Sequence, residues 1–325
     1  MGGCQDYKGI KTPRTEINEI IMKKHSIVSI LLLLSAMTIN AKEKDFPKLT
    51  GPYLGQKPPG DIPELFMPGI ISNCDLHSSV YFSPDGNEVY FSKLTQSELN
   101  RFWNIMVMKQ ENGRWTKPQV ICKGLTPFLS PEGKTLVFST EDWDLWKMER
   151  LSTGWSDPVN LGPIINFSRR QDGPSLTRDG TLYFSTSFQD GKGIVRSTLK
   201  DGRYTEPQAL ESTINSNYNE GFPFIAPDDS YIIFSSFRPG SYGLGDLYIS
   251  FKKSDGTWTE PVNMGHKINS DVKDRFPYVS PDGKYFFFNS NRVSGLNERP
   301  IPDGPGNIYW VDAKVIEALK PKELK

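Results

Sequence analysis

SPDGKYFFFNS, the stretch from Ser280 to Ser290, joins a turn signal to a run of apolar residues. Pro281 restricts its own φ angle, and Gly283 accepts the left-handed backbone conformation that a tight turn requires. Two apolar segments joined by such a turn favour a β-hairpin. The stretch therefore predicts a pair of antiparallel strands.

The same turn recurs along the chain, five times in all. The position of Pro281 is occupied earlier by Pro84, Pro131, Arg178 and Pro227, at spacings of 47, 47, 49 and 54 residues. Short apolar runs flank the turn, as at Val80-Tyr81-Phe82 in the first copy. A repeat of about 50 residues is typical of one four-stranded blade of a β-propeller. We therefore predict an all-β, five-bladed β-propeller of four-stranded blades.

The outermost strand is also visible in most copies. A third apolar run leads into an aromatic-x-x-Pro segment that begins at Trp115, Trp155, Tyr204 or Trp258. Proline lacks a backbone N–H and therefore suits an outermost strand. The fifth copy has no such segment, because residues 312–319 follow its third strand and favour a short C-terminal helix.

The missing strand is available near the start of the chain. The segment Pro63–Phe66 matches Pro261–Met264 of the fourth copy, although Gly60 stands where Trp258 does. We expect this N-terminal strand to close the ring, which removes exposed sheet edges. The alternative of six blades needs a further blade from residues 42–62, which are too few and too rich in proline and glycine.

The repeats resemble the Pro-Asp-type, WD-like repeats of the TolB family of β-propellers. The resemblance rests on the pattern Ser-Pro-Asp-Gly-Lys-x-x-x-Phe-x-Ser at residues 280–290 and covers residues 62–312. Arg178 in the third copy and Asp229 in the fourth depart from the pattern. The resemblance implies the fold and is weak for function, because the family includes ligand-binding and protein-binding modules and related propellers attached to peptidases.

An export signal precedes the repeats. Lys23 and Lys24 stand before an apolar run of about thirteen residues that ends close to Ala41, as in a secretory signal. The run is shorter than the roughly 20 residues that span a bilayer. We divide the chain into an upstream extension (1–21) before a true start at Met22, a signal peptide (22–41), a lead-in (42–61), the propeller (62–312) and a helical tail (313–325). We expect a periplasmic or secreted monomer.

Composition and motifs exclude several functions. The chain has 38 basic and 38 acidic residues, so no basic excess is present to neutralise nucleic acid. It contains no Gly-x-Ser-x-Gly elbow, Walker loop, dinucleotide fingerprint or Cys-x-x-Cys pair. Only His77 and His266 follow the signal, too few for the multi-histidine metal site of propeller-type lyases. We expect no cofactor and no metal. Cys74 and Cys122 pair or remain as two thiols, and the sequence leaves this open.

The candidate ligand-binding residues lie where the inner strands begin. In a blade, the Pro-Asp-Gly turn joins strands one and two on one face, so the longer loops and the links between blades share the opposite face. Side chains on that face are expected to surround the mouth of the central channel, and they are His77, Asp172, Glu220, Arg238, Asp274 and Arg292. Polar groups that pair with each other in a channel are the structural alternative. Asn104, Asp144, Asp246 and Asn307, which precede the third strands, are interpreted as Asx caps and not as metal ligands.

Three functions remain open on the sequence alone. The first is a non-catalytic module that binds a protein partner or a small glycan, with Arg238 and Arg292 as forked donors for a carboxylate. The second is a glycosidase in which Glu220, Asp172 and Asp274 act as acid, base and pKa modulator. The third is a scaffold protein of the cell envelope. Because a fold does not specify a function, the repeat pattern does not decide among them.

Overall fold

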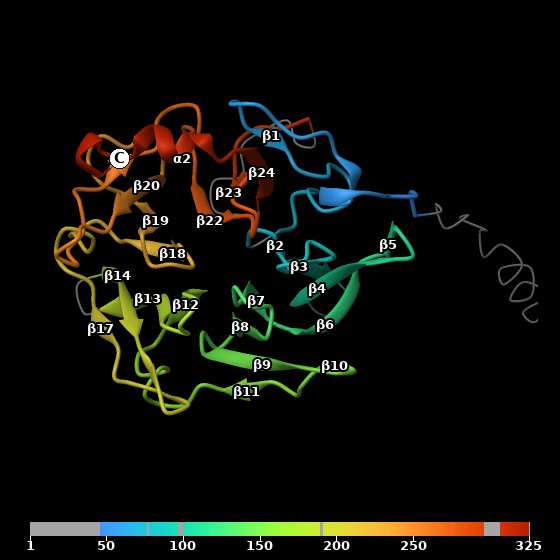
Figure 1. The fold of residues 1–325 in the computed structure, drawn as a ribbon, viewed down its shortest axis with the longest axis horizontal. Helices are drawn as coiled ribbons and strands as arrows, with labels where there is room; N and C mark the ends of the chain where they lie inside the picture. Colours follow the sequence, from blue (N-terminus) through green and yellow to red (C-terminus); the bar gives the residue numbers. More distant parts are fainter. Residues whose placement is uncertain (1–45, 77, 97–100, 189–190, 296–305, 325) are drawn as a thin grey trace, which may run out of the picture. The chain divides into compact units, whose positions relative to one another are not determined.

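The computed structural model describes residues 46–76, 78–96, 101–188, 191–295 and 306–324, and the chain from Lys48 onward forms one compact unit. Five antiparallel sheets of four or five strands stand around a common centre in this unit, and one two-stranded hairpin adjoins them (Figure 1). The predicted five-bladed β-propeller is therefore confirmed.

Blades 1 to 4 are each built from consecutive strands, and blade 5 takes its fourth strand from near the start of the chain. Blade 1 comprises β2 (Tyr81–Phe82), β3 (Glu88–Gln96), β4 (Arg101–Glu111), β5 (Arg114–Trp115) and β6 (Gln119–Lys123). Blade 2 comprises β7 (Leu125–Leu129), β8 (Thr135–Ser139), β9 (Leu145–Leu151), β10 (Gly154–Trp155) and β11 (Val159–Asn160). Blade 3 comprises β12 (Gln171–Leu176), β13 (Leu182–Phe188), β14 (Gly191–Ser197) and β17 (Gln208–Ala209), with the small hairpin of β15 (Leu199–Lys200) and β16 (Arg203–Tyr204). Blade 4 comprises β18 (Gly221–Ile225), β19 (Tyr231–Ser236), β20 (Asp246–Phe251) and β21 (Val262–Asn263). Blade 5 comprises β22 (Asp274–Val279), β23 (Tyr285–Ser290), β24 (Asn307–Asp312) and β1 (Glu64–Leu65).

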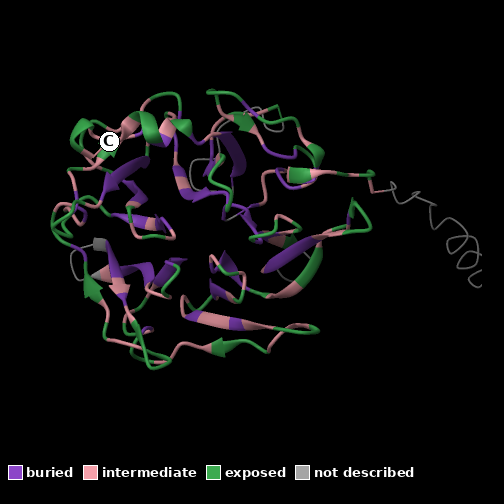
Figure 2. Cartoon of the chain, in the orientation of Figure 1, coloured by how far each residue is buried: buried purple, intermediate pink, exposed green. Residues whose placement is uncertain are grey.

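Burial falls from the centre of the ring to its edge. All five residues of β7 and all six of β12 are buried, whereas both residues of β17 are exposed. Figure 2 shows the same gradient, with buried residues along the inner strands and the exposed β11 at the rim. The core thus lies between blades, where the apolar faces of adjacent sheets pack.

The aromatic-x-x-Pro segments differ from the prediction in one detail. In blades 1 and 2 the fourth strand is broken into two pieces, because β5 and β6 both pair with β4, and β10 and β11 both pair with β9. Pro118 and Pro158 stand in the two breaks. Proline cannot donate to the ladder, so no pairing runs through it, and the ladder resumes at the residue that follows it.

The N-terminal strand closes the ring as predicted. Strand β1 pairs with β24 in antiparallel register, with Glu64 opposite Trp310 and Leu65 opposite Tyr309. Val262 and Asn263 take the same positions opposite Ile249 and Tyr248 in blade 4. Even without the tryptophan, Gly60 contributes its carbonyl, which accepts a hydrogen bond from Asp312 N at 2.9 Å.

A strap from Lys48 to Gln56 holds the closing strand in place. It includes the 3₁₀ turn η1 (Pro52–Gly55), in which Tyr53 packs against Tyr285 and donates a hydrogen bond to Asp282. Gln56 uses its amide to donate to Leu65 O at 2.9 Å and to accept from Met67 N at 2.7 Å. The strap therefore joins blades 5 and 1 where the two ends of the propeller meet.

The remaining expectations concern the chain ends and the cysteines. The tail forms helix α2 (Lys314–Leu319), as expected. Residues 1–45, including the expected signal peptide, lie outside the described residues. No helix in the described part of the chain is long and apolar enough to cross a membrane. Cys74 and Cys122 form no disulfide, and burial raises the pKa of the Cys122 thiol to about 12.

Closure of the ring leads to a first prediction. Phe66 is fully buried against Phe287 and Trp310, with ring centroids 5.2 and 5.1 Å away. Replacing Phe66 by Ala leaves a cavity in the closing blade, so we expect the free energy of unfolding to fall by about 3 kcal/mol or more. The exposed Ile62 nearby supplies the control, Ile62→Ala. Equal effects of the two substitutions in denaturant titrations would show that the closing strand does not stabilise the ring.

A charged cluster joins blades 1 and 2 on the side of the Pro-Asp-Gly turns. Glu88 pairs with Arg150 of β9, and Tyr90 donates a hydrogen bond to Glu88. Arg150 also lies over the Trp155 ring, 4.1 Å from its centroid. Burial alone would raise the pKa of Glu88, but the hydrogen bonds from Tyr90 and Arg150 and the charge of Arg150 lower it overall.

The lowered pKa of Glu88 gives a second prediction. A carboxyl whose pKa is lower in the folded than in the unfolded chain stabilises the fold above its usual pKa of 4.5. That stabilisation is lost as the pH falls below 4.5, when the unfolded chain takes up the proton first. In Glu88→Gln we expect a shallower loss of unfolding free energy between pH 5 and pH 3, as measured by urea titration. Glu132→Gln is the exposed control, and a wild-type slope in Glu88→Gln would contradict the assignment.

Candidate functional site

The two faces of the ring differ in what they carry. Tight turns such as Ser83–Gly86 join the first and second strands on one face. The loops between the second and third strands and the links between blades lie on the other, which we call the loop-bearing face. The longest fully described loop between a second and a third strand runs from Phe237 to Gly245.

Aromatic rings close the central channel. Each inner strand contributes the residue that stands three positions before its turn proline or the equivalent of that proline. Four of these residues carry aromatic rings, and the five are Tyr81, Phe128, Ser175, Phe224 and Tyr278. The rings of Tyr81 and Tyr278 are 4.9 Å apart, and those of Phe128 and Phe224, from blades that are not neighbours, are 6.4 Å apart. Burial raises the pKa of the Tyr81 and Tyr278 hydroxyls. A ligand therefore has to approach one of the two faces and not pass along the axis.

Four inner strands bulge at one level, two residues before these rings. The residues there have φ between 41° and 58°, and they are Thr126, Gly173, Phe222 and Phe276. Pairing with the second strand shifts register at the same points. Gly173 is required, because a Cβ there would stand 2.9 Å from Phe222 Cα. Left-handed backbone at residues other than glycine stores strain, and such bulges are frequent beside binding sites.

Two of the candidate acids form repeated pairs with the candidate arginines. Glu220 lies 3.4 Å from Arg238 in blade 4, and Asp274 lies 2.8 Å from Arg292 in blade 5. Both carboxylates are fully buried, whereas the two arginine side chains are 14% and 19% exposed. The acids are therefore shielded from solvent, whereas each arginine side chain reaches solvent in part.

Both pairs hold the links between blades. Glu220 accepts a hydrogen bond from Ser216 N at 2.9 Å, and Asp274 accepts one from Ser270 N at 2.6 Å. On the other side of each pair, Arg238 donates to Thr213 O and Arg292 to Ile268 O. Each guanidinium also lies over aromatic rings of its own blade. The ion pair, the hydrogen bonds to backbone carbonyls and the ring contacts together hold each arginine in one orientation.

Asp172 forms a third pair in a different setting. Its carboxylate lies 3.1 Å from Arg170 and accepts hydrogen bonds from Thr126, Ser139 and Gly173 N. Arg170 is 29% exposed and lies over the Trp143 ring, 3.6 Å from its centroid. The structure thus places five of the six candidate residues at the loop-bearing ends of the blades, as three acid–arginine pairs. His77 lies outside the described residues, and ligand binding by the other five stays a prediction.

The asparagines that organise this face were not identified from the sequence. Asn166, Asn215 and Asn269 each bond both backbone groups of the third strand of the preceding blade, at Leu145, Ile194 and Leu247 respectively. The signal was present, because residues 159–166 read VNLGPIIN and residues 262–269 read VNMGHKIN. These segments link neighbouring blades and set where each inner strand begins.

The residues that precede the third strands act within the fold. Asp246 accepts hydrogen bonds from Tyr242 N at 2.8 Å and Gly243 N at 3.1 Å, which agrees with the Asx-cap interpretation. Asp144 accepts one from the Asn160 side chain. The described residues contain no group of three His, Cys, Asp or Glu side chains placed to hold a metal ion.

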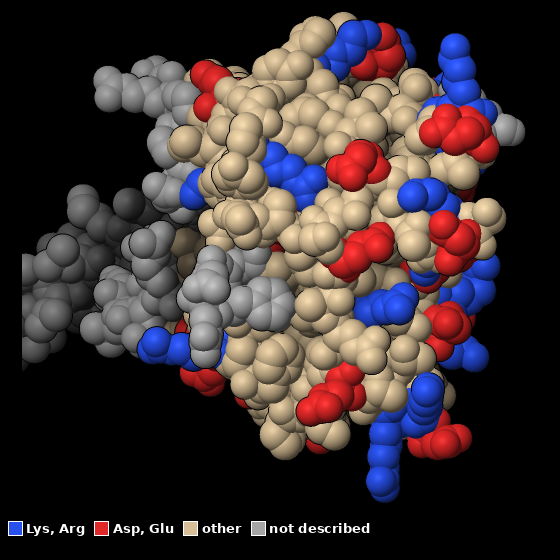
Figure 3. Space-filling model, turned by 90° about the vertical axis from the view of Figure 1, so that its left-hand side faces the viewer, with Lys and Arg blue, Asp and Glu red and all other residues tan. Residues whose placement is uncertain are grey.

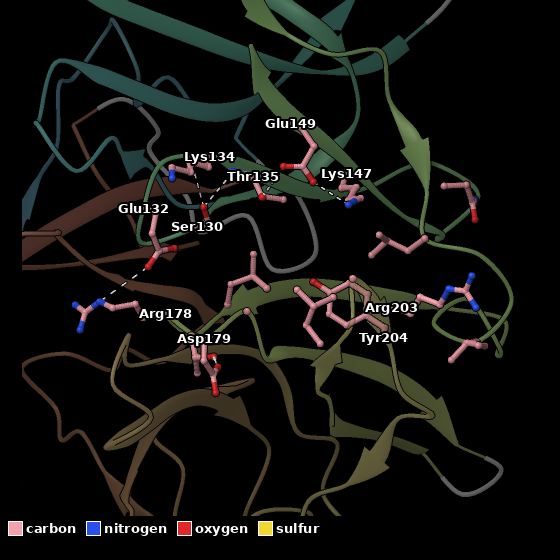
Figure 4. Close-up of a pocket in the computed structure, with 18 of the residues that line it drawn as sticks. Ser130, Glu132, Lys134, Thr135, Lys147, Glu149, Arg178, Asp179, Arg203 and Tyr204 are labelled. Carbon is pink, nitrogen blue, oxygen red and sulfur yellow. Dashed lines mark hydrogen bonds and ion pairs between the residues drawn. The ribbon is translucent and has the colours of Figure 1, made fainter. Parts of the chain in front are cut away.

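Outside the loop-bearing face, a groove of about 560 Å³ lies between blades 2 and 3 (Figure 4). Its charged groups pair locally, as Lys147 does with Glu149 and, more loosely, Arg178 with Glu132. On the side of the molecule that Figure 3 shows, acidic and basic side chains are interspersed. We therefore place the candidate site on the loop-bearing face.

Several solved structures are distantly similar to this chain. TolB from Acinetobacter baumannii is 16% identical with a TM-score of 0.47, and the match covers 74% of this chain and 57% of that one. The Bacteroides ovatus protein described as xyloglucan PUL GH43B is 15% identical with a TM-score of 0.47, covering 73% and 52%. A GH43_12 protein from a capybara gut metagenome is 14% identical with a TM-score of 0.47, covering 81% and 55%.

These likenesses assign no function to this chain. The chain spans only 52–57% of the length of the three similar structures, and their identities are below 20%. No family model matches the sequence. No curated protein matches it either.

The buried pairs lead to a third prediction. Arg238→Met leaves the Glu220 carboxylate buried without its partner, so we expect the free energy of unfolding to fall by about 3 kcal/mol. Arg178→Met is the control, because that side chain is 70% exposed and 4.0 Å from Glu132. An exposed pair of this kind contributes about 0–1 kcal/mol. If chemical denaturation shows the two variants to be equally stable, Glu220 does not depend on Arg238.

Proposed function

We propose that this chain is an exported β-propeller binding module whose loop-bearing face recognises a protein partner or a small glycan. One observation carries the proposal. Large aromatic side chains are exposed on the links and loops of that face, at Phe167, Tyr218, Phe237 and Tyr242, each 43–54% accessible. Aromatic side chains exposed on a rigid scaffold are typical of recognition sites.

The arrangement of the candidate residues supports the same proposal. Arg238 directly follows the exposed Phe237, and Arg238 and Arg292 are both partly exposed and are positioned by their buried acids. In this scheme Arg238 and Arg292 contact the ligand, whereas Asp172, Glu220 and Asp274 are positioning residues. Arginines held in this way lose little conformational entropy when they bind a carboxylate.

The same contacts favour binding over acid–base chemistry. Each of the three buried acids accepts a hydrogen bond from a backbone N–H and pairs with an arginine. A glycosidase needs one carboxyl group that carries a proton and one that attacks or activates water. The pairing keeps these carboxylates occupied within the fold. We therefore place the module among binding proteins.

Two substitutions at exposed aromatic residues of the loop-bearing face test the proposal. The purified full chain is applied to an array of neutral and acidic oligosaccharides and to an array of synthetic peptides. We expect the protein to bind at least one of these two classes of ligand. The double variant Tyr218→Ser, Phe167→Ser is expected to bind it at least tenfold more weakly, a loss of about 1.4 kcal/mol in binding free energy. Val120→Ser, an exposed apolar residue on an outer strand, is the matched control and retains binding.

The result that contradicts the proposal is equally specific. Binding that survives in the double variant, or that falls equally in Val120→Ser, places recognition elsewhere. Release of shortened oligosaccharides from the array, abolished in Glu220→Gln, would identify an enzyme.

A further inference from the structure

The groove between blades 2 and 3 is lined differently from its neighbours in the ring. Opposite the aromatic residue of the outer strand, blade 2 places Arg150 and blade 4 places Lys252. Each of these cations pairs with a carboxylate. In blade 3 the same position, opposite Tyr204, is occupied by Leu199. An aliphatic side chain therefore replaces one member of an ion pair, and the groove beside it has an apolar floor.

Aliphatic side chains from both blades form this floor. Leu161 and Ile164 come from the link that leaves blade 2, and Leu176 and Leu199 come from blade 3. Ile164 and Leu199 are 51% and 39% exposed, so part of the apolar surface faces water. The turn of blade 3 holds Leu199 closely, because a Cβ at Gly180 would stand 3.1 Å from Leu199 Cδ2. A concave, mostly apolar groove of about 560 Å³ has the size of a small-molecule site.

Each of the three acids that line the groove already has a partner in the fold. Glu149 pairs with Lys147 at 2.8 Å, and Glu132 lies 4.0 Å from Arg178, as Figure 4 shows. Asp179 accepts hydrogen bonds from two residues of its own turn. The described lining of the groove therefore offers a cationic ligand no unpaired carboxylate.

Two further basic side chains of the groove have no such partner. Within the described residues, neither Lys134, just before β8, nor Arg203, on β16, lies within ion-pair distance of a carboxylate. The Tyr204 hydroxyl has no hydrogen-bond partner there either. Burial and, to a smaller extent, the charge of Glu149 raise the pKa of Tyr204, so its hydroxyl stays protonated and can donate. Lys147 offsets the charge of Glu149 toward a ligand. An anion that accepts hydrogen bonds pairs with the groups that the fold leaves unpaired.

We propose that the groove between blades 2 and 3 binds a small monocarboxylate with an apolar body. The apolar body packs on Ile164 and Leu199, and the carboxylate pairs with Arg203 and accepts a hydrogen bond from Tyr204. Lys134 adds positive charge from the wall that blade 2 provides. This site is separate from the loop-bearing face, and it does not depend on the proposed function.

Isothermal titration calorimetry of the full chain with four related compounds tests the proposal. 4-Phenylbutyrate combines a carboxylate with an apolar body, whereas 4-phenylbutanamide and 4-phenylbutylamine replace the carboxylate and acetate lacks the apolar body. We expect 4-phenylbutyrate to bind with a Kd of about 1 mM or below, and the other three compounds to bind at least tenfold more weakly. Higher salt is expected to weaken the binding of 4-phenylbutyrate, because its carboxylate pairs with exposed cations.

Variants of the groove identify the contacts. Arg203→Gln removes the charge, Tyr204→Phe removes only the hydroxyl, and Ile164→Ser removes apolar floor. Each of the three is expected to bind 4-phenylbutyrate at least fivefold more weakly than wild type. Arg114→Gln is the matched control and keeps wild-type affinity, because the exposed Arg114 precedes Trp115 on β5 as Arg203 precedes Tyr204 on β16.

Several outcomes overturn the inference. These are binding of no compound, equal binding of the amide or the amine, and wild-type affinity in both Arg203→Gln and Tyr204→Phe. Binding of an acidic peptide that contains Leu and Phe, in place of 4-phenylbutyrate, overturns it too, because the groove then serves a protein partner. Thermal unfolding of each variant is expected to match wild type, since the altered groups are exposed or unpaired, and it separates lost binding from lost folding.

Discussion

The pairing of β1 with β24 is the constraint on which the rest of the structure depends. A ring of sheets has no free edge only when its last blade is complete. Here Glu64 and Leu65, which precede all the other strands in the sequence, complete the last blade. A two-residue pairing is weak by itself. Phe66 and the strap from Lys48 to Gln56 reinforce it with buried aromatic contacts and side-chain hydrogen bonds. Closure fixes the angular position of every blade, and with it the position of each loop.

The links between blades convert this ring into a defined surface. An asparagine in each of three links bonds the third strand of the blade before it, and in blades 4 and 5 an acid–arginine pair follows. Glu220, Asp274 and Asn269 are buried and all of these groups are hydrogen-bonded, so they specify geometry more than they add stability. The links leave a few aromatic side chains exposed and the arginine side chains partly exposed on this face. The central channel beneath them is closed by aromatic rings.

Particular residues show how far the sequence could be interpreted. The position of Pro63–Phe66 opposite the third strand of blade 5 followed from its match to Pro261–Met264, because equivalent residues in repeats take equivalent registers. The break at Pro118 and Pro158 was not predicted, since the aromatic residue and the proline read as one strand. The candidate acids lie at the loop-bearing ends of the inner strands, and ligand binding there stays a prediction. Their pairing with arginines and their full burial depend on side-chain directions that no repeat spacing reports.

The sequence by itself determined the number of blades, their strand order, the closing strand and the face that carries the loops. Those features follow from local turn chemistry and from the spacing of the repeats, and both are visible in the order of the residues alone. Only the tertiary structure decided which polar residues pair within the fold and which side chains remain exposed to solvent. The reason is physical: burial and pairing arise between residues of different links and blades, such as Glu220 with Arg238 or Gly243 with Ser270, once the ring brings them together.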